Sequence, residues 1–258
     1  MAGTVHHMER GAGIPLVLIH GFPHDRTLWL PQLDGLSDAA RVIAPDLRGF
    51  GASRGVPEVM TMDDHARDVK ALLDSLGIDR AVVCGLSMGG YIALAFAELF
   101  PDALRGLILC NTRAAADGPE ARKGRYATAK RAMEQGVAGI ADSMAPKMIS
   151  AASATRKPEL PGLIHALITR QPAEAVAASA RGMAQRPDRT PMLSSIAVPT
   201  LIITGSADDL IPPADSQAMA RAIPGSTLVT LPGAGHLTNL EDPEGFNAAV
   251  RGFLGRLG

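Results

Sequence analysis

The sequence predicts an α/β fold, in which a mainly parallel β-sheet is flanked by helices on both faces and carries an all-helical cap. Short apolar runs alternate with helical stretches along most of the chain, which is the order of elements that builds a parallel sheet. The runs are continuously apolar, as strands buried on both faces require. The length of 258 residues and the hydrophobic content of 47% suit a globular chain with a large core.

Six runs rich in Val, Ile and Leu predict the strands of this sheet. They cover residues 15–20, 41–46, 81–85, 106–111, 199–205 and 226–233. Between them, residues 62–77 have apolar side chains at helical spacing and a terminal glycine. Residues 87–100 have the same spacing and end before Pro101, because the residue preceding a proline disfavours helix.

The alternation stops between residues 112 and 195, where the chain is rich in Ala, Met and Arg and no strand is predicted. Because this all-helical stretch interrupts a strand–helix series, we expect it to form a cap (lid) over a core domain made of residues 1–111 and 196–258. Prolines punctuate the stretch. Its expected helices are 119–135, 137–149, 161–170 and 173–186.

Charge and cysteine content exclude several classes of function. Lys and Arg total 25 against 26 Asp and Glu, so the chain as a whole does not favour a nucleic acid partner. Cys84 and Cys110 each close an apolar run, and two cysteines do not make a secreted disulfide scaffold. No metal-binding pattern, signal peptide or membrane-spanning run is visible, so we expect a cytoplasmic protein without membrane association.

The segment Gly85-Leu86-Ser87-Met88-Gly89 predicts a nucleophilic serine. It follows a predicted strand and opens a predicted helix, which is the context that gives G-x-S-x-G its meaning. A sharp turn exposes the Ser87 hydroxyl and strains its backbone, so the flanking glycines avoid collisions. The free N–H groups at the start of the helix favour negative charge beside the serine.

The segment His20-Gly21-Phe22-Pro23 follows an earlier strand and predicts an oxyanion hole. Acyl transfer needs two donors that face the oxygen on which negative charge develops. The backbone N–H of Met88, directly after the nucleophile, is expected to supply one donor. The N–H of Phe22 is expected to supply the other.

An acid and a base follow the last two predicted strands. Asp208 and Asp209 both lie after the strand at 199–205, where rigid β-structure can position a carboxylate. His236 lies on a Gly-rich loop after the strand at 226–233, so its imidazole can accept and return a proton at the serine. The chain order serine, carboxylate, histidine is that of the G-x-S-x-G hydrolases. The other histidines have weaker claims, although His165 in the cap could line a pocket.

With these motifs in place, the chain resembles the α/β-hydrolase superfamily over essentially its whole length. The matching segments are HGFP (20–23), DLRGFGAS (46–53), GLSMGG (85–90), GSADDLIPP (205–213) and GAGHLTNLEDPEGF (233–246). The resemblance implies the α/β-hydrolase fold with its cap inserted after the sixth strand of the family sheet. The family's G-x-x-D-x-x-x-P pattern selects Asp208 over Asp209. Before the first predicted strand, only residues 4–8 could form a further strand. We therefore expect one early strand of the family sheet to be reduced or absent.

Within the superfamily, the chain is most similar to small carboxylesterases and to 3-oxoadipate enol-lactonases. Haloalkane dehalogenases and epoxide hydrolases carry an Asp nucleophile where this chain has Ser87, so those activities are disfavoured. The expected function is hydrolysis of carboxylic esters through an acyl-enzyme, without a cofactor or metal. The first alternative is a lactonase, and the second alternative is a ligand-binding or signalling protein with little turnover. Hydroxynitrile lyase, perhydrolase and C–C hydrolase chemistry use similar triads.

The cap is expected to shape the pocket for a small ester or lactone. Leu210 and Leu237, which neighbour the predicted acid and base, are expected to line it. Residues 113–190 hold 13 Lys or Arg against 7 Asp or Glu, so the cap could attract anionic substrates, although a solvated helical surface is the favoured explanation of this charge. Nothing in the sequence specifies an oligomeric state. Cap methionines that could add an adaptable apolar lining are Met133, Met144, Met148 and Met183.

Overall fold

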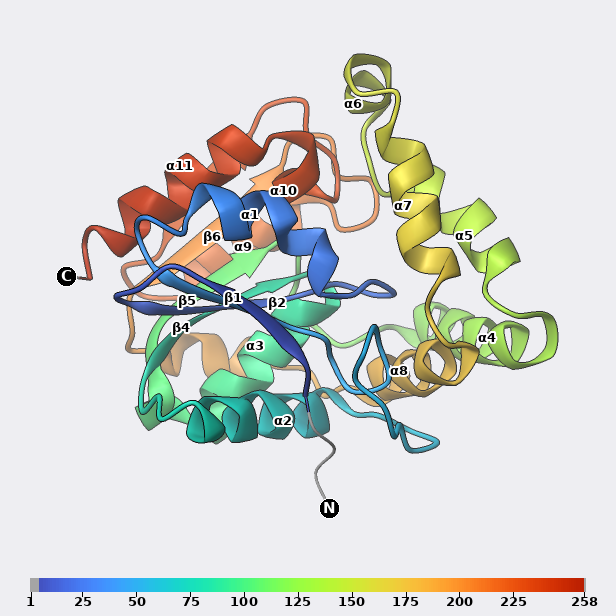
Figure 1. Cartoon of the computed structure of the whole chain (residues 1–258), viewed down its shortest axis with the longest axis horizontal. Helices are drawn as coiled ribbons and strands as arrows, with labels where there is room; N and C mark the ends of the chain where they lie inside the picture. Colours follow the sequence, from blue (N-terminus) through green and yellow to red (C-terminus); the bar gives the residue numbers. More distant parts are fainter. Residues whose placement is uncertain (1–4, 258) are drawn as a thin grey trace.

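A computed structural model describes residues 5–257 and confirms the predicted fold class (Figure 1). A seven-stranded sheet has the spatial order β1-β3-β2-β4-β5-β6-β7, and all its neighbouring pairs except β1–β3 are parallel. All six strands predicted from the apolar runs are present within a few residues of their expected ends. The strands are β1 (His7–Arg10), β2 (Pro15–Ile19), β3 (Arg41–Pro45), β4 (Ala81–Leu86), β5 (Leu104–Cys110), β6 (Thr200–Gly205) and β7 (Thr227–Leu231).

The short strand expected at residues 4–8 lies at His7–Arg10 and forms an edge of the sheet. It pairs antiparallel with β3, so that His7 faces Pro45 and Arg10 faces Val42. The first four residues of the chain lie outside the described part. Within residues 5–257, the sheet therefore begins with this four-residue strand.

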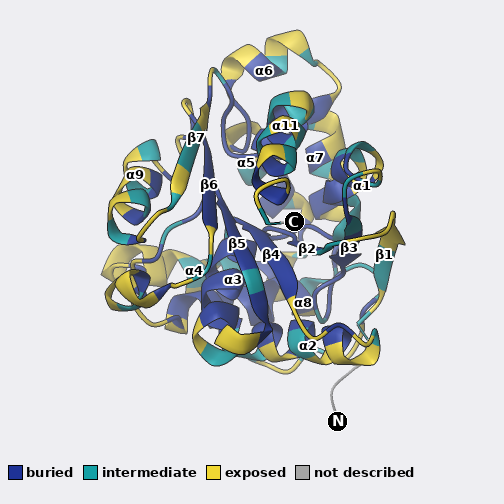
Figure 2. Cartoon of the chain, turned by 90° about the vertical axis from the view of Figure 1, so that its left-hand side faces the viewer, coloured by how far each residue is buried: buried dark blue, intermediate teal, exposed yellow. Residues whose placement is uncertain are grey.

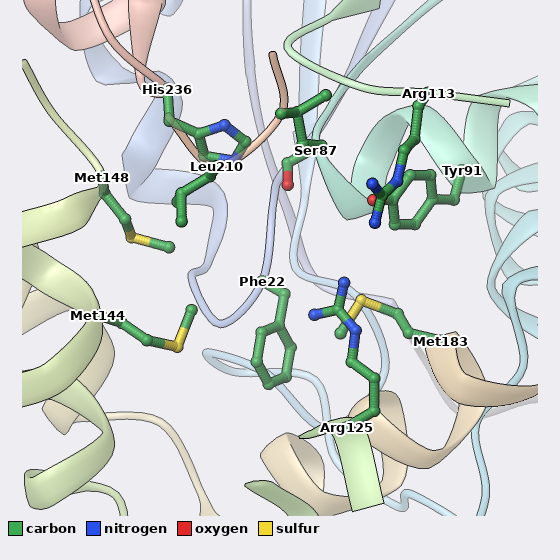
Figure 3. A pocket seen from close by; sticks show the side chains of 11 residues that line it. Phe22, Ser87, Tyr91, Arg113, Arg125, Met144, Met148, Met183, Leu210 and His236 are labelled. Atoms are coloured by element: carbon green, nitrogen blue, oxygen red, sulfur yellow. The ribbon is translucent and has the colours of Figure 1, made fainter. Parts of the chain in front are cut away.

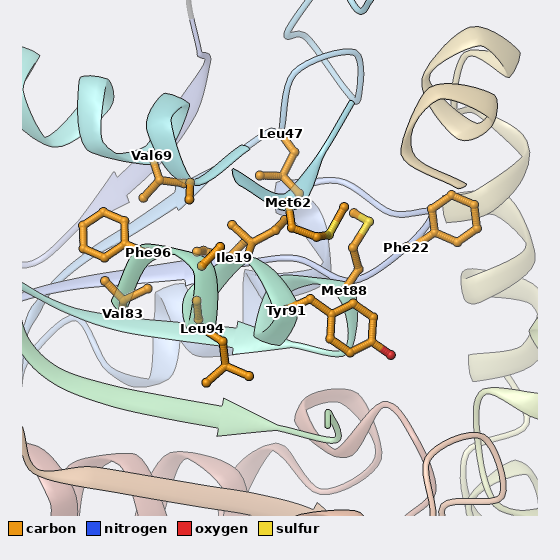
Figure 4. Packing of buried hydrophobic residues seen from close by; sticks show 14 of the residues in the cluster. Ile19, Phe22, Leu47, Met62, Val69, Val83, Met88, Tyr91, Leu94 and Phe96 are labelled. Carbon is orange, nitrogen blue, oxygen red and sulfur yellow. The ribbon is translucent and has the colours of Figure 1, made fainter. Parts of the chain in front are cut away.

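Alternate residues of each central strand pack into two cores on opposite faces of the sheet. Figure 2 shows the buried central strands between the helices of the two faces. In β2, Val17 and Ile19 face the helices α2 (Met62–Ser75), α3 (Met88–Leu99) and α9 (Pro213–Ala222), and Figure 4 shows part of this first core. Leu16 and Leu18 face α1 (Leu30–Gly35) and α11 (Pro243–Leu254) on the other side. Because both faces are covered, the strands must be apolar throughout.

The helical insertion lies between β5 and β6 and contains five α-helices. They are α4 (Pro119–Gln135), α5 (Ala138–Met144), α6 (Ala151–Arg156), α7 (Leu160–Thr169) and α8 (Ala173–Gln185). Four of these helices agree with the predicted ones. The helix expected at 137–149 ends already at Met144, because Pro146 interrupts it and the chain continues as a 3₁₀ turn at Ala145–Lys147. The six-residue α6 was not predicted. The remaining helical pieces are α10 (Thr238–Glu241) and 3₁₀ turns at Arg26–Trp29, Pro101–Ala103 and Thr190–Ser195.

Polar contacts attach this insertion to the loops at one edge of the sheet. Arg170, after α7, donates from Nε and a terminal nitrogen to Asp25 at 2.8 and 2.7 Å. Gln171 donates to the same carboxylate at 2.8 Å and accepts the Gly51 N–H at 3.1 Å. The Met60 N–H donates to the Ala178 carbonyl of α8 at 3.1 Å. The insertion is therefore held beside the loops that follow β2 and β3.

The described structure also shows the state of the cysteines, the character of the helices and the arrangement of potential metal ligands. Cys84 and Cys110 are buried free thiols on neighbouring strands, with their sulfurs 3.8 Å apart. Within residues 5–257, no helix has the length and apolar character needed to cross a membrane. No group of three or more potential ligands in the same residues is arranged to hold a metal ion.

Candidate active site

Ser87 occupies the sharp turn between β4 and α3. Its φ and ψ angles are 55° and −115°, so a non-glycine residue is held in a backbone conformation that costs energy. A Cβ atom at Gly85 would lie 2.0 Å from the Gly89 carbonyl oxygen, and one at Gly89 would lie 2.2 Å from the Ile19 oxygen. Both glycines are therefore required by close backbone packing, which explains the motif around Ser87.

The loop after β2 packs directly against this turn. A Cβ atom at Gly21 would lie 3.1 Å from Cδ2 of Leu86 and 3.2 Å from its carbonyl oxygen, so the loop packs closely against the residue before Ser87. In the described chain, the hydrogen bonds use neither the Phe22 N–H nor the Met88 N–H. Both N–H groups therefore lack a hydrogen-bond partner among the described residues; Met88 directly follows Ser87, and Phe22 lines a cavity together with Ser87.

His236 and Asp208 form a buried pair. His236 Nδ1 lies 2.9 Å from Asp208 Oδ2, and Oδ1 of the same carboxylate accepts the N–H groups of Leu210 and Ile211 at 2.9 and 3.0 Å. Burial alone would raise the pKa of Asp208, but the hydrogen bond and charge of His236, together with the other donors, hold this pKa below its ordinary value. Asp209 is exposed, so the structure places Asp208 beside the histidine.

Asn111 is a polar contact of this pair that the sequence analysis missed. It follows β5 with φ of 45°, and its Nδ2 donates to Asp208 Oδ2 at 2.9 Å and to the Gly235 carbonyl at 3.1 Å. Its Oδ1 accepts the Thr238 hydroxyl at 2.7 Å, which fixes the orientation of the amide. An asparagine directly after a predicted strand, at the edge that carries the other site residues, is the signal that could have identified it.

Glu241 is a second missed residue, and it holds the loop that carries His236. Its buried carboxylate accepts the N–H groups of Gly235 and Leu237 at 2.8 and 3.1 Å, on both sides of the histidine. It also accepts the Ser150 N–H at 3.0 Å, just before α6. One carboxylate thus ties the histidine loop to the helical insertion, because three backbone donors replace water around its charge.

A cavity of about 130 Å³ lies between these loops and the helical insertion (Figure 3). Ser87 and His236 both line it, although the described structure has no hydrogen bond between the Ser87 hydroxyl and the imidazole. Apo catalytic sites often have such loose geometry. The other lining residues are Phe22, Tyr91, Arg113, Arg125, Met144, Met148, Met183, Leu210 and Ile211.

The predicted pocket residues have different outcomes. Leu210 lines the cavity, as expected. Leu237 does not line the cavity, and this part of the prediction is corrected: the residue is 0% exposed, because its side chain belongs to the core on the α11 face. Among the cap methionines, Met144, Met148 and Met183 line the cavity, whereas Met133 is 51% exposed on α4.

Three other histidines, His24, His65 and His165, do not line the cavity. His24 and His65 are fully buried, and burial lowers the pKa of each to about 3. His65 on α2 lies 3.5 Å from the Ser179 hydroxyl of α8, at the contact between the core and the insertion. His165, whose side chain is 42% exposed, pairs with Asp142 at 3.0 Å.

Comparison with known proteins agrees with this architecture. A family model described as alpha/beta hydrolase fold matches residues 14–243. The chain is 32% identical over 241 residues to 3-oxoadipate enol-lactonase 2 of Acinetobacter baylyi, covering 93% of this chain and 88% of that protein.

Two solved structures are similar over nearly the whole chain. A thermophilic esterase from Thermogutta terrifontis, solved with malate bound, is 44% identical with a TM-score of 0.96, covering 98% of this chain and 93% of that one. An enol-lactonase from Burkholderia xenovorans LB400 is 31% identical with a TM-score of 0.90, covering 97% and 96%. These findings confirm the resemblance inferred from the motifs, and the chain is a hydrolase that belongs to the α/β-hydrolase family.

Proposed function

We propose that the protein is a serine hydrolase that cleaves carboxylic esters through an acyl-enzyme. The observation that carries this proposal is the convergence of a strained serine and a buried histidine–carboxylate pair on one cavity. This arrangement is the nucleophile, base and orienting acid that acyl transfer needs. The esterase relative supports the same reaction class.

In the proposed mechanism, Ser87 attacks the ester carbonyl while His236 takes the hydroxyl proton. Asp208 holds the imidazole in the correct tautomer and stabilises the imidazolium that forms. The N–H groups of Phe22 and Met88 bind the oxyanion. His236 then protonates the leaving alcohol, and the same residue activates the water that releases the acid and restores the serine.

We also propose that residues 112–195 act as a cap that closes the substrate pocket. Met144, Met148, Met183 and Arg125 belong to this segment and form much of the wall opposite the loops of the sheet. A pocket closed in this way excludes water from the acyl-enzyme until the alcohol has left.

Lactone hydrolysis is the second candidate, since a lactone is a cyclic ester that the same residues can open. Two observations favour it: the similarity to enol-lactonases and the two arginines in the cavity wall, which suit an acidic substrate. A ligand-binding role with little turnover is distinguished by kinetics, because such a protein would release one equivalent of alcohol and retain the acyl group.

The deciding experiment compares wild type with Ser87→Ala on p-nitrophenyl acetate, p-nitrophenyl butyrate and a panel of lactones. Removing the nucleophile should lower kcat by a factor on the order of 10⁴ or more, and should abolish the acyl adduct seen by mass spectrometry in rapidly quenched wild type. Ser194→Ala, at an exposed serine, is the matched control and should retain full activity. Full activity of Ser87→Ala would contradict the proposal.

A further inference from the structure

Three arginines converge on a single buried carboxylate at the edge of the cavity. Asp117 accepts Arg113 and Arg186 at 3.0 and 2.8 Å through Oδ1, and Arg125 Nε at 3.0 Å through Oδ2. Its side chain is 0% exposed. Arg186 also stacks over the Tyr91 ring at 3.9 Å. Asp117 therefore fixes the positions of guanidinium groups that would otherwise repel one another.

The arginines of this cluster have hydrogen-bond donors that no protein group uses. Arg113 and Arg125 line the cavity, while Arg186 lies behind them. Arg113 Nε is buried without a protein partner, and in the described chain neither terminal nitrogen of Arg125 donates to a protein acceptor. Asp215 is the other carboxylate near Arg113. Asp188 is near Arg186. The two guanidinium groups that line the cavity share one hydrogen-bonded carboxylate, Asp117, and keep donors that no protein group uses.

The cavity has two chemically different sides around Ser87. In Figure 3, His236, Met144 and Met148 lie on one side of the serine, and Arg113, Tyr91 and Arg125 lie on the other. Because His236 protonates the leaving oxygen, the alcohol of a bound ester must lie on the side of His236. The acyl chain then extends toward the arginines.

We propose that Arg113 and Arg125 bind a carboxylate carried by the acyl half of the substrate, so that the preferred substrates are monoesters of short dicarboxylic acids. This inference rests on the proposed esterase function and names its substrate class. Hydrolysis adds water across the ester C–O bond and gives a dicarboxylate, an alcohol and a proton. The guanidinium donors of Arg113 and Arg125 that no protein acceptor uses suit the two oxygens of a substrate carboxylate.

The first test compares three small esters by their kcat/KM values in a pH-stat. Monoethyl succinate carries its carboxylate on the acyl half, and ethyl 4-methylpentanoate is its neutral counterpart of similar shape. The third, 3-(propanoyloxy)propanoate, is an isomer with the carboxylate on the alcohol. We expect the kcat/KM value for monoethyl succinate to be at least tenfold higher than the values for the other two esters. Equal values for the charged and neutral esters, or a preference for the isomer, would overturn the inference.

The second test removes the charge from the cavity wall. Arg125→Gln should lower kcat/KM for monoethyl succinate by a factor on the order of 10 to 100, while the neutral ester changes less than threefold. Lys130→Gln is the matched control, because Lys130 lies on the same helix with its side chain 74% exposed. An equal effect of both variants would indicate general attraction by the cap and would overturn direct binding.

Two further measurements keep the inference testable if Arg125→Gln does not fold. Arg113→Gln should show the same selective loss. In wild type, succinate should inhibit hydrolysis of the neutral ester competitively, whereas butyrate at the same concentration should inhibit at least tenfold less; equal inhibition would contradict the carboxylate site. Failure of wild type to hydrolyse any ester would instead refute the proposed function, so the two proposals can be distinguished.

Discussion

The two walls of the cavity differ in how completely their charged groups are paired within the protein. On the sheet side, backbone N–H groups hold two buried carboxylates, that of Asp208 in the loop after β6 and that of Glu241 at the end of α10. On the insertion side, Met144 is half-buried and Arg125 keeps two nitrogens free of protein acceptors. Fully paired groups suit bond-making and bond-breaking, whereas free guanidinium donors and a methionine suit selection among substrates. Changes on the sheet side should therefore alter the rate for every ester, and changes on the other wall should alter the ratio between esters.

Glu241→Gln should have the largest effect among the variants that test this comparison. An amide cannot accept all three N–H groups, so the loop that carries His236 loses its anchor on at least one side. We expect kcat to fall by a factor on the order of 10 to 100 for charged and neutral esters alike. Steady-state kinetics on both esters would measure this.

Glu244→Gln provides the control for that variant, because Glu244 is exposed on the same segment. It should retain wild-type kinetics. A selective loss for one ester in Glu241→Gln would show that the sheet side also determines specificity, and would break the comparison.

Met144→Ala should have a smaller effect, confined to selectivity. It enlarges the cavity on the side where we place the leaving alcohol, so the kcat/KM ratio of butyl over ethyl esters should rise several-fold. Met133→Ala removes an exposed methionine from the neighbouring helix and should leave the ratio unchanged. A uniform fall for all esters would indicate that Met144 supports the fold of the site, not its selectivity.

His65→Gln tests the contact that joins the two regions and should leave activity at pH 7 nearly unchanged. Because the pKa of His65 is about 3 when folded, against 6.5 as the ordinary value, the unfolded chain binds the extra proton between these pH values. The free energy of unfolding should then fall with decreasing pH by about 1.4 kcal/mol per pH unit for each such histidine.

Urea unfolding between pH 6 and pH 4 would measure this dependence. His24 keeps its own contribution in the variant. The free energy of unfolding of His65→Gln should therefore change less steeply with pH than that of wild type, by the amount that one bound proton contributes. His165→Gln, at a histidine whose side chain is 42% exposed, should follow wild type. Parallel curves for His65→Gln and wild type would contradict the assigned burial effect.

The accuracy of the sequence predictions followed the length of each pattern. Helix α4 agrees with its predicted range because it is long, with seventeen residues between Gly118 and Gly136. Helix α6 has only six residues and was missed. The predicted site residues come from motifs in which a glycine or proline marks a backbone requirement, as at Gly85. Asn111 and Glu241 lie in no such motif of their own, since their partners come from loops distant in sequence.

The sequence by itself determined the sheet, the family and the positions of Ser87, Asp208 and His236, because each depends on local patterns that short-range sterics and burial impose. Only the tertiary structure decided what surrounds them. It turned Leu237 into the core, removed Met133 from the pocket and gathered Arg113, Arg125 and Arg186 around Asp117. The physical reason is that a cavity wall is built from separate helices whose mutual packing is set by long-range contacts, which no local pattern records.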